Sequence, residues 1–249
     1  MPQREPAICL RAVDYSETSQ VLQFLARESG VISLMGKGTK RPKGPAGGAI
    51  DLMAEGELVF IAKKGQALGV LTEFAESVSR RSLRSQAGAL NAGLYALELV
   101  GAALAESDPH PEVFDLLHNL LARLGKPGAP VPAVTAYFQW RLLRNVGLLG
   151  QMHACAGCGG PAAGASGRGR VYFSSAQGGL LCDACHPAVT EKLYADEHAL
   201  AGLAALAAAE AGQKANLTEP AARAVMRLLD YHVTYQHGRR LKMSRHVIE

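Results

Sequence analysis

The chain has 249 residues, of which 48% are hydrophobic and 19% are charged, and its formal net charge is +4. This composition is close to the globular average, so it excludes an intrinsically disordered chain, and the length favours two or three modules over one small domain. No stretch approaches the roughly 18 consecutive apolar residues that a bilayer crossing needs, and the N-terminus lacks the pattern of a secretory signal. We therefore expect a cytoplasmic protein without a membrane span.

Residues 7–74 are predicted to form a small five-stranded β barrel. Short apolar stretches alternate with turn-forming residues such as Ser29-Gly30 and Lys64-Gly65, which is the pattern of strands joined by tight turns. The connection from Gly36 to Gly48 holds five glycines and two prolines, too many for regular structure, so we expect a mobile basic loop. Barrels of the OB type carry such loops at their binding face. The expected strands are residues 7–10, 21–25, 31–35, 58–62 and 68–71.

From about Gln86 the hydrophobic pattern takes the helical period. Apolar residues recur on one face from Leu90 to Leu104, from Val113 to Leu124 and from Val134 to Leu149. The pattern stops at Gly150 and resumes in two further helices, expected over residues 190–211 and 218–235. Residues 151–187, which are rich in glycine, serine and cysteine, are therefore predicted to be an insertion within a helical domain.

Two C-x-x-C pairs, Cys155–Cys158 and Cys182–Cys185, are separated by residues 159–181, which are 23 in number. Each pair can place two thiolates in one tight turn, and four thiolates complete the tetrahedral shell of one structural Zn²⁺ ion. The separation exceeds the ~15 to 20 residues of the commonest four-cysteine pattern, and the extra length suits a hairpin. Redox dithiols or unpaired core cysteines are the alternatives, and His153 or His186 could replace one thiol. Cys9 lies in an apolar strand and is predicted to be a buried packing residue.

Basic residues gather in three clusters, and no acidic residue lies between Glu28 and Asp51. One such cluster is commonly a solvated face, but three together favour a polyanion partner, bound through phosphate contacts and therefore sensitive to salt. Tyr15 is a candidate for stacking on a base, although a tyrosine in a strand more often belongs to the core. We name the loop cluster (Lys37, Lys40, Arg41 and Lys43), the central cluster (Arg80, Arg81 and Arg84) and the tail cluster (Arg239, Arg240, Lys242 and Arg245).

The sequence contains no recognisable catalytic constellation. Residues 30–38 lack the spacing of a nucleotide-binding P-loop, and Gly164–Gly167 lacks that of a nucleophile elbow. Neither cysteine pair follows a proline, as a zinc deaminase requires. These observations favour a nucleic-acid-binding protein that is not an enzyme. The alternative is a nucleic-acid-processing enzyme whose zinc module holds the substrate.

Several motifs follow one another in a specific order along nearly the whole chain. They are Tyr15-Ser16-Glu17-Thr18-Ser19, Arg27, Gly30, Lys37-Gly38, Leu94–Leu99, Phe138–Arg144, Gly147-Leu148, Tyr172-Phe173-Ser174, Gly178-Gly179, the two cysteine pairs and Leu241–Arg245. This order resembles that of the bacterial RecO family of recombination mediator proteins. Ile50–Met53 departs from the family pattern, which usually has a Leu-x-Pro-Phe type segment there.

The resemblance implies an α+β protein with an N-terminal OB-fold in residues 1–80 and a helical domain in residues 81–150 and 188–249. A zinc finger in residues 151–187 is inserted in the helical domain. The resemblance also implies a DNA repair protein, without enzymatic activity, that binds single- and double-stranded DNA and anneals complementary strands. With RecR, it would load RecA onto strands coated by single-strand-binding protein, in the cytoplasm at the nucleoid.

Overall fold

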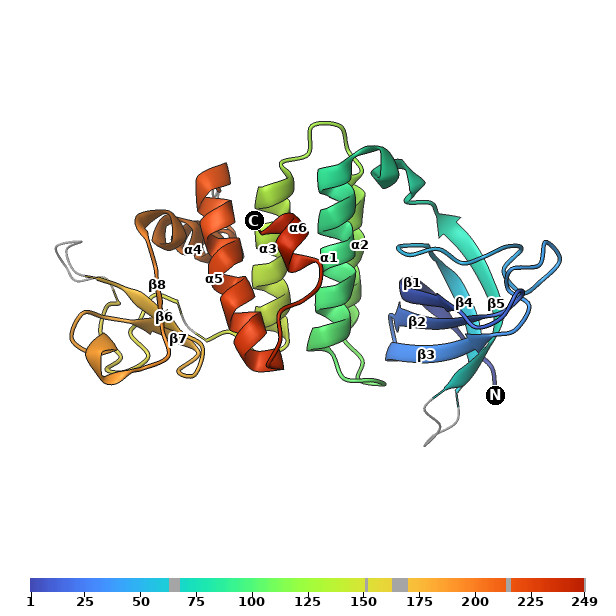
Figure 1. The fold of residues 1–249 in the computed structure, drawn as a ribbon, viewed down its shortest axis with the longest axis horizontal. Helices are drawn as coiled ribbons and strands as arrows, with labels where there is room; N and C mark the ends of the chain where they lie inside the picture. Colours follow the sequence, from blue (N-terminus) through green and yellow to red (C-terminus); the bar gives the residue numbers. More distant parts are fainter. Residues whose placement is uncertain (63–67, 151, 163–169, 214–215, 249) are drawn as a thin grey trace. The chain divides into compact units, whose positions relative to one another are not determined.

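The computed structural model describes residues 1–62, 68–150, 152–162, 170–213 and 216–248 (Figure 1). These residues form two compact units, Met1–Ala129 and Pro130–Glu249. Among them, no helix is long and apolar enough to cross a membrane. The predicted turn at Lys64-Gly65 and the segment Gly164–Gly167 lie outside the described residues. The four domain ranges expected from the sequence stay predictions.

The N-terminal strands close into a barrel in the order β1-β2-β3-β5-β4, which confirms the predicted OB-type barrel. Neighbouring strands pair antiparallel, except that β3 and β5 are parallel. Alternate side chains point inward, and fully buried rings such as Phe24 and Phe60 fill the interior. The strands are β1 (Gln3–Asp14), β2 (Gln20–Ala26), β3 (Gly30–Gly36), β4 (Glu55–Ile61) and β5 (Gly69–Val78).

A register shift between Cys9 and Arg11 changes which side chains of β1 face the core. Cys9 is fully buried before the shift, as predicted, and burial raises the pKa of its thiol to about 12. After the shift Ala12 packs against the core, and Val13 is 45% exposed. An extra residue in a strand produces this reversal, because side chains alternate between the two faces with a period of two.

The connection after β3 contains no helix or strand from residue 37 to residue 54, as predicted. It is nevertheless held at both ends by the buried side chain of Gln20. Thr39 Oγ1 lies 3.2 Å from Gln20 Oε1, and Ile50 N–H donates to the same oxygen at 3.0 Å. The mobility predicted for this loop remains a prediction.

The atypical segment Ile50–Met53 forms a turn beside β1. Met53 N–H donates to Cys9 O at 2.9 Å, and Cys9 N–H donates to Ala54 O at 2.9 Å. Met53 has a φ of 65°, in the left-handed region that side chains rarely adopt. Its side chain is buried against Gly93, where an added Cβ would lie 2.9 Å from Met53 Cε. Glycine at position 93 therefore makes room for the methionine.

Two helices complete the first unit, α1 (Ala87–Ala103) and α2 (Pro111–Leu124), after the short helix η1 (Arg81–Ser85). They lie side by side (Figure 1). The helix α2 begins with a proline at its first position, where the missing N–H has no intrahelical partner to lose. Both helices match the periodic segments expected from the sequence.

The second unit packs α5 (Glu219–His237) against α3 (Val131–Asn145) and α4 (Glu197–Glu210) and ends in α6 (Ser244–Val247). A small sheet lies between α3 and α4 in the chain, with β6 (Tyr172–Ser174) between β7 (Gly179–Leu181) and β8 (Leu193–Tyr194). The antiparallel strands β6 and β7 confirm the hairpin expected between the cysteine pairs. The single-turn helix η2 (His186–Ala188) follows the second pair.

Two helix predictions are wrong in extent. The helix expected over residues 190–211 starts only at Glu197, because Asp196 caps it and residues 193–194 pair with β6. Asp196 Oδ1 accepts the Ala199 N–H at 2.7 Å, and this contact fixes the helix start. The helix expected to reach Leu149 ends at Asn145, and Gly147 takes a left-handed φ of 73° just after it.

Candidate metal centre and nucleic-acid interface

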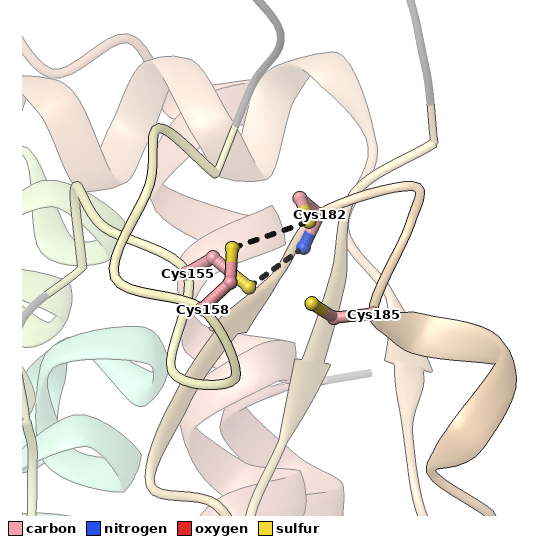
Figure 2. Close-up of side chains that lie close together, drawn as sticks. All are labelled: Cys155, Cys158, Cys182 and Cys185. Carbon is pink, nitrogen blue, oxygen red and sulfur yellow. Dashed lines mark hydrogen bonds between the residues drawn. The ribbon is translucent and has the colours of Figure 1, made fainter.

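The two cysteine pairs come together in the second unit (Figure 2). The Sγ atoms of Cys155, Cys158, Cys182 and Cys185 all lie within 4.8 Å of one another, and those of Cys158 and Cys182 are 3.9 Å apart. A Zn²⁺ ion with four Zn–S bonds of ~2.3 Å in tetrahedral geometry would hold its sulfurs about 3.8 Å apart. The four thiols can therefore hold a metal ion, and their number and spacing fit zinc.

Local backbone geometry positions each pair. Cys155 N–H donates to Gly160 O at 2.7 Å, and Gly159 N–H donates to Cys155 O at 2.8 Å. In the second pair, the N–H groups of Cys185 and His186 both donate to Cys182 O, at 3.1 and 3.0 Å. A Cβ at Gly157 would lie 3.1 Å from Cys185 Cβ, so glycine allows the two turns to approach each other.

The environment favours thiolate at one of the four sulfurs. Burial opposes ionisation of Cys155, but N–H groups of Cys182, Cys158 and Gly157 donate to its sulfur and lower its pKa to about 6. In contrast, the neighbouring thiols of Cys182, Cys158 and Cys155 raise the pKa of Cys185 to about 12. Four thiolates would repel one another at this distance, and a divalent cation removes that repulsion.

The two histidines considered as substitutes for a thiol are not in this group. Among the described residues, the four cysteines alone meet the geometry of a metal cluster here. The His186 ring instead packs on Tyr172, with ring centroids 4.4 Å apart, and His153 is exposed. The predicted donor set of four sulfurs is therefore the one that the fold brings together.

Glu191 ties the turn between β6 and β7 to helix α5. Its carboxylate accepts from Ser174 Oγ at 2.9 Å, from the Ser175 and Ala176 N–H groups at 3.2 and 2.9 Å, and from the Tyr231 hydroxyl. Burial opposes ionisation of Glu191, but these donors together lower its pKa. Burial and the carboxylate raise the pKa of Tyr231 to about 12. No sequence pattern pointed to this contact.

We expect Glu191→Gln to lower the free energy of unfolding of the second unit by about 1–3 kcal/mol, because an amide offers one acceptor where the carboxylate accepts four donors. The pKa of Glu191 is lower in the folded than in the unfolded state. Its stabilisation is thus complete above the unfolded pKa of about 4.3 and disappears as the pH falls through the folded pKa. Urea unfolding at neutral and acidic pH measures this difference.

The matched control is Glu210→Gln, which removes a half-exposed carboxylate paired with Arg144 at 3.5 Å and should cost less than about 1 kcal/mol. A difference between Glu191→Gln and the original protein that stays constant down to pH values below the folded pKa would show that Glu191 does not act through its charge.

The loop cluster lies beside the turn between β1 and β2. Lys37, Arg41 and Lys43 are exposed, and none of them takes part in an ion pair among the described residues. Lys40 Nζ is paired with Asp14 at 2.8 Å. A hollow of about 410 Å³ separates the loop from the turn, and its lining residues are Tyr15, Ser16, Thr18, Ser19, Met35, Lys37, Gly38 and Arg41.

The central cluster is placed differently, because each of its arginines faces an acid. Arg80 Nη2 lies 2.7 Å from Glu55 Oε2, and both side chains are nearly buried. Arg84 pairs with Asp51, and Arg81 Nη2 lies 4.0 Å from Glu76. Glu55 and Asp51 lie 25 and 33 residues before their arginines, so the basic run alone did not indicate them, whereas Glu76 lies close to Arg81 in sequence. DNA binding by this cluster stays a prediction.

The tail cluster also contains a cation with a structural partner. Arg240 Nε lies 3.0 Å from Asp230 Oδ2, and buried Asp230 accepts the Ser244 hydroxyl as well. The contact joins α5 to the segment that leads into α6. Arg239, Lys242 and Arg245 are exposed, and DNA binding by the tail cluster stays a prediction.

Comparison with known proteins identifies the family. Residues 1–79 match the family model described as Recombination protein O N terminal, and residues 84–245 match Recombination protein O C terminal. The DNA repair protein RecO of Anaeromyxobacter dehalogenans is 32% identical over 246 residues, which cover 97% of this chain and 94% of the relative. That of Rhodopirellula baltica is 33% identical over 81% of this chain and 73% of the relative. The DNA repair protein RecO of Bacillus subtilis is 28% identical over 72% of this chain and 66% of the relative. Because the two models together span the barrel and nearly all of the helical region, the chain belongs to the RecO family of DNA repair proteins.

Proposed function

We propose that this chain is a recombination mediator that binds single- and double-stranded DNA at the barrel and performs no reaction of its own. The observation that supports this most directly is the loop cluster, where Lys37, Arg41 and Lys43 are exposed, close together in sequence and without acidic partners among the described residues. Elsewhere, the arginines of the central cluster face acids. Cations without an acidic partner on a non-helical loop can contact successive phosphates of a DNA backbone.

The four-cysteine group holds one Zn²⁺ ion in this proposal, and the ion has a structural role. Cys155, Cys158, Cys182 and Cys185 would fill all four positions of a tetrahedral shell, which leaves none for a reactive water. The closed donor set supports a mediator over the alternative, a nucleic-acid-processing enzyme. Incubation with labelled DNA separates the two, since turnover of the DNA would identify an enzyme.

In this proposal the finer activities are those that the resemblance to the RecO family implies. The protein anneals complementary strands without nucleotide hydrolysis and acts with RecR to load RecA onto DNA coated by single-strand-binding protein, in the cytoplasm at the nucleoid. Annealing brings two phosphate backbones within a Debye length, ~10 Å at 0.1 M salt, so two separate basic surfaces would assist it. The loop cluster and the tail cluster are the candidates for these surfaces.

We expect Lys37→Ala/Arg41→Ala/Lys43→Ala to weaken binding to single strands and duplexes alike. Each lost phosphate contact on a single strand should reduce the slope of log affinity against log salt by about 0.7. The charge-matched control is Arg123→Ala/Lys126→Ala/Arg227→Ala, which removes three exposed cations elsewhere. Fluorescence anisotropy over a salt series measures both quantities, and the annealing rate without ATP is recorded in parallel. We call the triple variant of Lys37, Arg41 and Lys43 the loop variant. If the loop variant keeps the salt slope of the original protein, the DNA does not bind at this loop.

A further inference from the structure

An apolar row crosses the outside of the barrel over four neighbouring strands. Ladder pairing places Val13 opposite Val21, Val21 opposite Met35, and Met35 opposite Val70. Val13 and Val70 are 45% and 44% exposed, and the other two are half-buried. Outward positions of a solvated sheet are usually polar, so a continuous row of this kind indicates a contact surface. We name Val13, Val21, Met35 and Val70 the apolar row.

The apolar row leads into the hollow beside the loop cluster. Met35 belongs to both, because it lines the hollow together with Tyr15, Lys37 and Arg41. Tyr15 is 69% exposed, so the alternative that this tyrosine belongs to the core is wrong. Its backbone is fixed, since Tyr15 N–H donates to Ser19 O at 2.9 Å across the turn. An aromatic ring on a fixed turn therefore stands beside an apolar surface and two cations.

Exposed cations lie on both sides of the apolar row. Lys37 and Arg41 lie on one side, and exposed Arg11 lies on the other, in the next row of paired residues. Among acids, Asp14 is paired with Lys40, and Glu106 accepts from Ser33 Oγ at 2.8 Å. Two further exposed acids lie close by in sequence, Glu17 in the turn and Glu73 on β5, and Glu73 lies 3.6 Å from Arg4 Nη2. This distribution complements a polyanion whose apolar groups are accessible.

We propose that the apolar row and Tyr15 hold unstacked bases of a single strand while Lys37 and Arg41 contact its phosphates. This inference rests on the proposed DNA binding and adds a preference for single-stranded over duplex DNA. A duplex presents phosphates but hides its base faces, so the cations serve both forms of DNA, whereas the ring and the apolar row serve the single strand alone. Every base has a π-face, so the preference is independent of sequence.

The test uses the full-length protein with an oligothymidylate and a blunt duplex as probes. Tyr15→Ala should weaken oligothymidylate binding by roughly tenfold, as loss of one stacked base does, and leave duplex affinity unchanged. Tyr15→Phe should bind both probes normally, because the ring remains. Val13→Thr/Val70→Thr keeps the shape of both side chains and should also weaken only the single-strand complex. Tyr235→Ala, which removes a 49% exposed tyrosine of the second unit, is the matched control.

The salt dependence separates this inference from the proposed function. Tyr15→Ala should keep the salt slope of the original protein, because no phosphate contact is lost, whereas the loop variant should reduce it. Equal losses on both probes, or no loss on either, would overturn the base contact. A change of oligomeric state in Val13→Thr/Val70→Thr would assign the row to a second copy of the chain. If the unmodified protein binds neither probe at low salt, the proposed function itself fails.

Discussion

Cys182→Ser is expected to release the metal ion and to disorder the turns that carry the cysteine pairs, while the barrel stays folded. Cys182 supplies one of four sulfurs that lie within 4.8 Å of one another. In small zinc modules the free energy of metal binding, ~10–16 kcal/mol in isolated peptides, is the free energy that orders the fold. A serine hydroxyl at neutral pH does not replace a thiolate as a ligand. Metal analysis and amide hydrogen exchange by mass spectrometry measure the two effects.

The size of the effect follows from how little else holds these turns. The strands β6 and β7 have three residues each and β8 has two, so the sheet alone buries a small apolar surface. Phe173 is fully buried and its ring meets His232 of α5 edge to face, with centroids 5.3 Å apart. Strand β6 should therefore keep more protection from exchange than residues 152–162 and 182–188, which contain the cysteine turns.

Cys9→Ala is the control, because it removes a cysteine that is buried in the barrel and lies outside the sulfur group. This variant should keep one zinc ion per chain and lose stability in the first unit only. Full zinc retention by Cys182→Ser, or the absence of zinc from the original protein, would contradict the assignment of the ion and its ligands.

Local sequence signals predicted the parts of this molecule that depend on local geometry. The spacing of the cysteine pairs indicated the sulfur group, and alternation indicated the strands, because a side-chain period of two or 3.6 is visible within a few residues. The outward turn of Val13 was not visible, since it depends on a register shift in β1 that only pairing with β2 creates. The strand at residues 193–194 was missed for the same reason, because its partner is β6.

The sequence also did not reveal which acidic residues form ion pairs with the basic clusters. A basic run indicates an exposed surface when nothing neutralises it, but Arg80 meets Glu55, a residue 25 positions earlier, and Arg240 meets Asp230 on α5. Each pair forms because the fold brings two elements together. The loop cluster differs, since no acid lies near it in sequence. Lys40 pairs with Asp14, but Lys37, Arg41 and Lys43 have no ion-pair partner among the described residues.

Glu55→Ala is expected to destabilise the first unit by about 3–5 kcal/mol, because it leaves a nearly buried arginine without its counter-charge. Glu55 on β4 accepts from Arg80 Nη2 at 2.7 Å, and its other oxygen lies 2.6 Å from His118 Nδ1 of α2. The side chains of Arg80 and Glu55 are 12% and 10% exposed, and Arg80 Nε has no partner among the described residues. The carboxylate thus joins the barrel to α2 and compensates Arg80. Urea unfolding of the first unit measures the loss.

The double variant Glu55→Leu/Arg80→Met separates stability from DNA binding at Arg80. Replacing a buried ion pair by apolar side chains of similar volume is often close to neutral, so the double variant should recover most of the stability that Glu55→Ala loses. Its DNA affinity should equal that of the original protein, because the charge of Arg80 is already balanced by Glu55. A stable double variant with weaker DNA binding would instead place Arg80 in the DNA interface, as the basic run in the sequence suggested. The double variant therefore separates the two roles of Arg80. A structural role predicts unchanged DNA affinity, and a role in the DNA interface predicts weaker DNA affinity.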